Sequence, residues 1–206
     1  MLRLTHGCLA LALLLGGSAI QAQETKTGQP SPEEMQAMMA EMMEYATPAE
    51  HHKHIEALVG NWDYTMRFHM APDAPWQEGT GQAVHKWILG GRFLQATIKS
   101  PPSEAIPMEF EGLGLLGYDN FAGEYVQLWM DNFMTGAVML KGSCTESGKQ
   151  ITVDGKLTKP MGEGHKIDVR WVYKIASNDE FTFEMWEPDS NGEMYLHGEI
   201  SYTRAH

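Results

Sequence analysis

From Gly60 to the C-terminus, apolar and polar residues alternate with a period of two. The first such stretch places Trp62, Tyr64, Met66 and Phe68 between polar neighbours. A strand with one buried and one solvated face requires this alternation, because successive side chains point to opposite faces of a sheet. The pattern continues in segments 82–89, 93–99, 110–118, 124–130, 136–142, 151–157, 167–174, 181–185 and 196–203. We therefore expect about ten short antiparallel strands.

The two ends of this region favour a closed barrel over a sandwich. Gly60-Asn61-Trp62 opens the first strand, and Arg204 ends the last one. In lipocalin-like proteins, which this arrangement resembles, a basic side chain from the last strand stacks on a tryptophan of the first. Closure also removes unpaired strand edges. We predict a single antiparallel lipocalin-like (calycin) β-barrel over residues 61–206, closed by Gly60, Trp62 and Arg204.

The first 22 residues are typical of a signal peptide. Arg3 supplies the positive charge, residues 8–15 form an apolar run, and Ala22 is the small residue that precedes a cleavage point. This run is too short for a membrane anchor, which needs about 20 apolar residues. We expect a mature chain that begins at Gln23, has no integral membrane segment, and is periplasmic or secreted.

Residues 23–30 form a polar leader, which we expect to be flexible, and residues 31–60 form a helical segment. Ser31 and Thr47 each precede a proline, with a glutamate three residues after the hydroxyl, a pattern that predicts two helix starts with capping boxes. Each helix has an apolar stripe to bury. The stripe of the first consists of Met35, Met38, Met39, Met42 and Met43.

Charge and cysteine content narrow the possible partners. The chain has 27 acidic and 15 basic residues, a formal net charge of −12, which argues against nucleic acid as a partner. Cleavage of the signal peptide removes Cys8 and leaves Cys144 alone, so no intrachain disulfide is expected. A domain of this size buries enough surface to be stable without a disulfide or a metal. The sequence leaves the oligomeric state open.

A set of short motifs, in order along residues 44–204, resembles an uncharacterised bacterial family known as domain of unknown function 1579. The motifs include Gly60-x-Trp62, Phe110-x-Gly112-x-Gly114, Trp129-x-Asp131 and Ile200-x-Tyr202-x-Arg204, together with Thr47-Pro48, His52, Ile55, residues 90–94, residues 117–119, Tyr125 and Gly155. The resemblance implies a calycin-like barrel. It implies no activity and no catalytic residues.

Aromatic residues on the dry faces of the strands predict an interior pocket. A barrel of eight or more strands can hold one small ligand, and aromatic walls with a few polar tips line such pockets. We expect a small, largely apolar ligand to contact Tyr64, Phe68, Trp87, Trp129, Trp171, Tyr173 and Met185. Leu94, Ile98, Val169 and Phe183 should complete the wall. The alternative is that these rings simply fill the core.

Other chemistries have weaker support in the sequence. A hydrolase or isomerase could use the same cavity, although no nucleophile elbow, zinc helix or phosphate loop is present. Glu109 with Glu111, or Asp131 with His85, are possible acid and base pairs, but solvated acidic residues are the simpler interpretation. No cofactor is predicted. Strand parity points His197 outward, which argues against haem.

Metal handling is the third possibility. His51, His52 and His54, which follow the methionine-rich helix, are candidate ligands for a soft metal such as copper. Lys53 within this cluster and the packing-like spacing of the methionines argue against it. No metal site is predicted.

Overall fold

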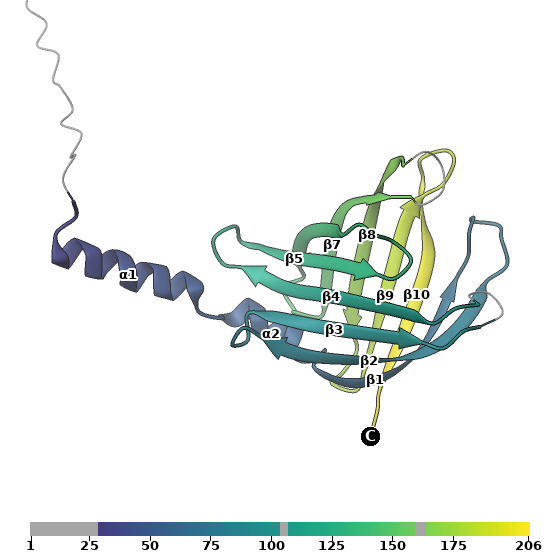
Figure 1. Cartoon of the computed structure of the whole chain (residues 1–206), viewed down its shortest axis with the longest axis horizontal. Helices are drawn as coiled ribbons and strands as arrows, with labels where there is room; N and C mark the ends of the chain where they lie inside the picture. Colours follow the sequence, from purple (N-terminus) through teal and green to yellow (C-terminus); the bar gives the residue numbers. More distant parts are fainter. Residues whose placement is uncertain (1–28, 104–106, 160–163) are drawn as a thin grey trace, which may run out of the picture. The chain divides into compact units, whose positions relative to one another are not determined.

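The structure is a computed structural model that describes residues 29–103, 107–159 and 164–206. Ten antiparallel strands form a closed barrel, in which each strand pairs with its neighbours in sequence and β1 pairs with β10 (Figure 1). The strands are β1 (Gly60–Phe68), β2 (Gln77–Ile88), β3 (Phe93–Ser100), β4 (Phe110–Asp119), β5 (Glu124–Asp131), β6 (Val138–Cys144), β7 (Gln150–Thr158), β8 (Lys166–Ile175), β9 (Glu180–Pro188) and β10 (Met194–Arg204). The predicted fold class is confirmed.

The strand β2 begins five residues before its predicted start. Gly79 and Gly81 weaken the strand signal in the sequence, because glycine has a low strand propensity. In the barrel they lie opposite Met66 and Tyr64 of β1. A Cβ atom at Gly81 would overlap the ring of Tyr64. These glycines are therefore strand residues that make room for large side chains on the neighbouring strand.

The predicted inward wall is confirmed by burial. Leu94, Ile98, Val169 and Trp171 are buried, and Tyr173, Phe183 and Met185 pack against the same core. The alternate positions face outward, where oppositely charged side chains pair across neighbouring strands. Three of these ion pairs are Arg67–Glu199, Lys156–Asp168 and Arg170–Asp154. A shift of one residue would exchange these two faces, so burial sets the register.

Two helices precede β1: α1 (Pro32–Ala46) and α2 (Glu50–Glu56). The capping box at the start of α1 is confirmed, because the amide of Glu34 donates to Ser31 Oγ and the amide of Ser31 donates to Glu34 Oε2. The predicted box at Thr47 is wrong. Its hydroxyl donates to the carbonyl of Met43, and the α2 cap is instead a hydrogen bond from the Ala49 amide to His52 Nδ1.

The two helices differ in what they bury. The helix α2 buries Ile55 and His52, whereas no residue of α1 is buried. The five methionines of α1 are 49% to 59% exposed, so its expected apolar burial is absent. Neither helix of the described residues has the length and apolar character needed to cross a bilayer. The predicted signal segment lies outside the described residues.

Candidate functional site

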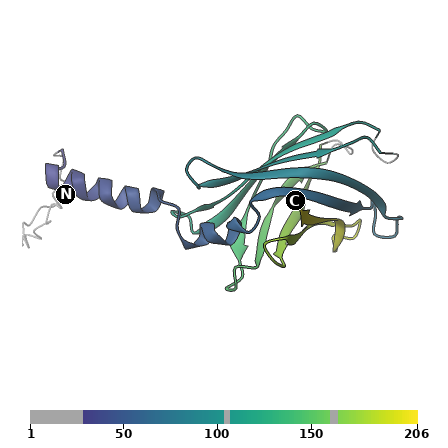
Figure 2. The ribbon, with the colours of Figure 1, turned by 90° about the horizontal axis from the view of Figure 1, so that it is seen from below.

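At one end of the barrel, β10 ends beside the start of β1, and α2 precedes β1 at the same end (Figure 2). The Arg204 guanidinium lies over the Trp62 ring, 4.3 Å from the ring centre. Arg204 also donates to the carbonyl of Val59, at 2.9 Å, and to the Asp179 carboxylate, at 3.0 Å. Gly60 makes this approach possible, because a Cβ atom there would overlap Arg204 Nη1. The three residues predicted to close the barrel, Gly60, Trp62 and Arg204, therefore lie together.

The carbonyl of Leu58, in the turn between α2 and β1, links this turn to β1 and β2 at the same end of the barrel. It accepts hydrogen bonds from Trp62 Nε1, at 2.9 Å, and from His85 Nδ1, at 3.0 Å. The second ring nitrogen of His85 is buried without a hydrogen-bond partner among the described residues. Burial lowers the pKa of His85 to about 4. The imidazole is therefore neutral at physiological pH, as a residue of the core would be.

Aromatic rings fill the barrel interior next to this end. Phe181 and Tyr202 stack with their ring centres 4.2 Å apart, and Phe181 meets Trp62 edge to face at 4.8 Å. Tyr64 lies 5.4 Å from Tyr202. Burial raises the pKa of Tyr202 well above its usual value. At this end of the barrel the aromatic rings fill the core, which is the alternative to a ligand pocket.

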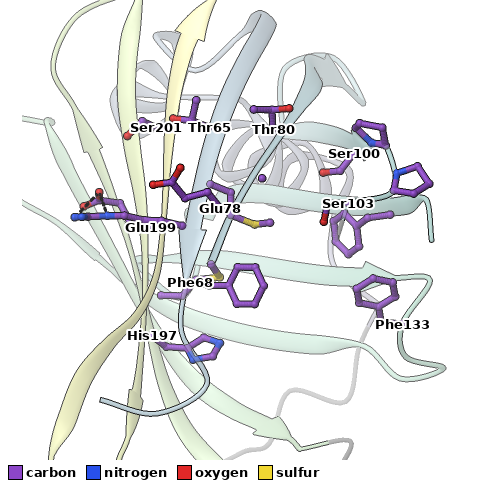
Figure 3. Close-up of a pocket in the computed structure, with 17 residues that line it drawn as sticks. Thr65, Phe68, Glu78, Thr80, Ser100, Ser103, Phe133, His197, Glu199 and Ser201 are labelled. Carbon is purple, nitrogen blue, oxygen red and sulfur yellow. Dashed lines mark hydrogen bonds and ion pairs between the residues drawn. The ribbon is translucent and has the colours of Figure 1, made fainter. Parts of the chain in front are cut away.

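The opposite end contains a cavity of about 650 Å³ (Figure 3). This end is formed by the C-terminal end of β1 and the N-terminal ends of β2, β4 and β10. Apolar side chains make up most of its inner wall, namely Met66, Phe68, Phe110, Phe133 and Met185. Ser100 and His197 add polar groups. Part of the volume extends onto the outer face of β1, β2 and β10, where it is bordered by polar and charged residues, namely Thr65, Arg67, Glu78, Thr80, Glu199 and Ser201.

His197 faces this cavity, so its predicted outward orientation is wrong. The β9–β10 register shifts between Leu196 and Gly198, which leaves His197 as an extra residue without a partner in β9. Such a bulge interrupts the alternation of the strand and redirects side chains. His197 consequently lines both the cavity and an adjoining recess of about 170 Å³. Strand parity therefore does not place this histidine on the outer face.

A buried carboxylate lies beside His197. Glu187 Oε1 accepts hydrogen bonds from Lys159 Nζ, at 3.0 Å, and from the Tyr195 hydroxyl, at 2.9 Å. The same oxygen lies 3.6 Å from His197 Nδ1, which is too long for a hydrogen bond. Burial lowers the pKa of His197, and Glu187 opposes this effect. Strand parity identifies Glu187, because it continues the inward series of Phe183 and Met185 along β9.

The residues predicted to bind ligand separate into three groups. Phe68 and Met185 line the cavity, and Trp129 and Trp171 line the recess that shares Met185 and His197 with it. The hydroxyls of Tyr64 and Tyr173 already have partners: Tyr64 bonds Ser100 Oγ, and Tyr173 donates to Gln127 Oε1 at 2.8 Å. Trp87 packs against the core. The buried Gln127 was not predicted from the sequence, although it lies on the same face of β5 as Tyr125 and Trp129.

The suggested acid and base pairs are not formed. Asp131 accepts a hydrogen bond from Trp129 Nε1 near the cavity, whereas His85 lies at the closed end of the barrel. Glu111 forms an exposed ion pair with Lys99. Burial raises the pKa of the Cys144 thiol, the opposite of what an activated nucleophile requires.

The three candidate metal ligands on α2 have separate roles. His52 accepts the hydrogen bond that caps the helix, His54 Nδ1 bonds the Tyr125 hydroxyl at 2.7 Å, and His51 stacks on Tyr118. In the described part of the chain, no group of three or more histidine, cysteine, aspartate or glutamate side chains is arranged to hold a metal ion.

Comparisons with known proteins give a family for this chain and solved structures that resemble it. The family profile described as "Protein of unknown function (DUF1579)" matches residues 47–204. No protein with a curated description matches the chain. The crystal structure of Rv2717c from M. tuberculosis is similar with a TM-score of 0.57 and 15% identity, covering 78% of this chain and 100% of that chain. A redesigned beta barrel gives a TM-score of 0.38 and 16% identity, over 73% of this chain and 94% of that one.

Proposed function

The chain belongs to the DUF1579 family, and we propose that it binds a small, largely apolar molecule in the cavity at the open end of its barrel. The observation that carries this proposal is the cavity itself. Its volume of about 650 Å³, which includes the part on the outer face of the strands, lies within the range of about 300 to 1,000 Å³ found for ligand sites. Its inner wall combines Phe68, Phe110 and Phe133 with two methionines, which adapt to ligands of different shape.

The half of the barrel interior around Trp62 is filled by side chains, and this supports the same proposal. Trp62, Phe181 and Tyr202 are buried and hold the strands together without help from a ligand. The fold therefore does not depend on filling the other half of the interior, and the apolar surface there can contact a ligand. Burying that surface gives an apolar ligand about 25 cal/mol for each Å² removed from water.

A titration with N-phenyl-1-naphthylamine, a neutral probe that fluoresces in apolar surroundings, tests this function. We expect saturable binding that Phe68→Ala weakens about tenfold, or 1.4 kcal/mol. Met139→Ala is the matched control, since Met139 lies on β6 and is 58% exposed. Probe binding that is equal in both variants and the parent protein would refute binding at the open end.

An enzyme that uses the same cavity is the second candidate, and the pair formed by Glu187 and His197 is what favours it. A carboxylate that orients an imidazole is a common arrangement for proton transfer. The separation of 3.6 Å between Oε1 and Nδ1 is longer than the hydrogen bond such a pair uses. The apolar wall is the stronger observation, and ligand binding remains the proposed function.

We also propose that the mature protein is periplasmic or secreted. The support is the charged start, the short apolar run at residues 8–15, and the small residue Ala22. An exported binding protein would meet its ligand outside the cytoplasm.

A further inference from the structure

His197 lines the cavity, and behind it Glu187 lines the adjoining recess and pairs with Lys159. Glu187 is held by Lys159 and Tyr195, and its side chain is only 8% exposed. Lys159 balances the charge of Glu187, because the two form an ion pair at 3.0 Å. His197 stands on the cavity side of this pair and lines the wall beside Phe68 (Figure 3).

The two nitrogens of His197 have different surroundings. Nδ1 is buried, makes no hydrogen bond with the described residues, and lies 3.6 Å from the Glu187 carboxylate. A proton on Nδ1 is favoured there, because it faces a negative charge. The second nitrogen, Nε2, then carries a lone pair. Burial lowers the pKa of the ring, whereas Glu187 and an interaction with the His69 backbone raise it; the net shift is downward and favours the neutral form.

This arrangement discriminates between head groups by charge. The group formed by Glu187, Lys159 and His197 has no net charge when Lys159 and Glu187 are paired and His197 is neutral. The charged residues that line the cavity itself, Arg67, Glu78 and Glu199, lie on its outer-face part, where Arg67 pairs with Glu199. A ligand carboxylate would lose its hydration next to Glu187, and a ligand ammonium would compete with Lys159 for the same oxygen; both cost free energy in an apolar cavity. A ligand hydroxyl group can donate a hydrogen bond without the cost of burying a charge.

We propose that the cavity selects apolar molecules that end in a hydroxyl group, which donates a hydrogen bond to Nε2 of His197. The inference rests on the proposed function and names the chemical class of its ligand, an apolar alcohol. The apolar body lies against Phe68 and Met185, and Glu187 acts as a positioning residue that holds the imidazole in its accepting form.

Displacement of N-phenyl-1-naphthylamine at pH 7.5 by a series of ten-carbon ligands tests the inference. The series consists of 1-decanol, its methyl ether, decanoic acid and decylamine. The methyl ether is the matched control, because it keeps the oxygen and loses the donor. We expect 1-decanol to displace the probe at concentrations about tenfold lower than the other three, the effect of one buried hydrogen bond.

Two variants then assign the preference to His197. In His197→Leu the alcohol and the ether should displace the probe at equal concentrations, whatever the affinity of the variant for the probe itself. His197→Gln, whose amide oxygen can accept a hydrogen bond, should restore part of the preference for the alcohol. Circular dichroism verifies that both variants fold.

The outcomes separate this inference from the proposed function. If the probe binds but the alcohol and ether displace it equally in the parent protein, cavity binding stands and hydroxyl selection is wrong. A preference that persists in His197→Leu also overturns the inference. If the probe does not bind the parent protein at all, the proposed function fails and the inference fails with it.

Discussion

The guanidinium of Arg204 lies 4.3 Å from the centre of the Trp62 ring and so joins the last strand of the barrel to the first. The ring is 1% exposed and also contacts Phe181 and Tyr202. Its indole nitrogen donates to the carbonyl of Leu58. One side chain therefore connects α2, both terminal strands and the core.

Removal of that ring should destabilise the protein strongly. We expect Trp62→Ala to lower the free energy of unfolding by about 3 to 5 kcal/mol, as for other large-to-small changes in a core. Trp62→Phe should cost less, because it keeps an aromatic face for Arg204. Equilibrium unfolding in urea measures the stability of both variants. A near-neutral Trp62→Ala would contradict the burial of this ring between the first and last strands.

Gly60 should tolerate no side chain. Its φ of 142° is unfavourable for other residues, and a Cβ atom would overlap Arg204 Nη1. We expect Gly60→Ala to lower the melting temperature, with a cost of about 1 to 3 kcal/mol. Gly136→Ala is the control, because nothing lies within 4 Å of a Cβ atom there. Equal melting temperatures for the two variants would disprove the steric argument.

The buried His85 predicts a loss of stability in acid. Its pKa is about 4 in the folded protein and 6.5 in the unfolded chain. The unfolded chain therefore takes up this proton first as the pH falls. Stability should decrease from about pH 6.5 downward, with a contribution from this residue of about 3 kcal/mol that is fully lost only below its folded-state pKa.

The variant His85→Asn isolates this contribution from that of the carboxylates, because asparagine can still donate to Leu58 but does not titrate. Urea unfolding at pH 7 and pH 4 gives the difference in free energy for each protein. That difference should be about 3 kcal/mol smaller in His85→Asn. An unchanged difference would mean that His85 does not carry the effect.

The hydrogen bond from Tyr173 to Gln127 should show strong non-additivity. Gln127 is 3% exposed, so Tyr173→Phe leaves a buried carbonyl oxygen without this donor, at a cost of about 1 to 3 kcal/mol. The double variant Tyr173→Phe with Gln127→Leu should recover most of the loss, because both partners become apolar. Unfolding measurements on the full cycle check this, and simple addition of the two single effects would refute it.

Export should produce a chain that begins at Gln23. The small residue Ala22 precedes this point, and the apolar run ends before it. N-terminal sequencing of protein recovered from the periplasm or the medium measures the start directly. A chain that still begins at Met1 would contradict the proposed processing.

The alternation of apolar and polar residues made much of the fold and part of the site predictable. Inward positions follow from parity in β1, β3, β8 and β9, and Glu187 and Gln127 obey the same rule even though both are polar. The meeting of Trp62 with Arg204 was expected because a closed barrel brings its first and last strands together.

What the sequence determined by itself is therefore a barrel with a given set of inward side chains, because period-two patterning and burial fix the register. The tertiary structure decided which half of the interior is filled and which way His197 faces. Ring packing at the closed end depends on contacts between distant strands, which no local pattern encodes. The bulge at His197 breaks parity through a mismatch with β9, and only the paired strands reveal it.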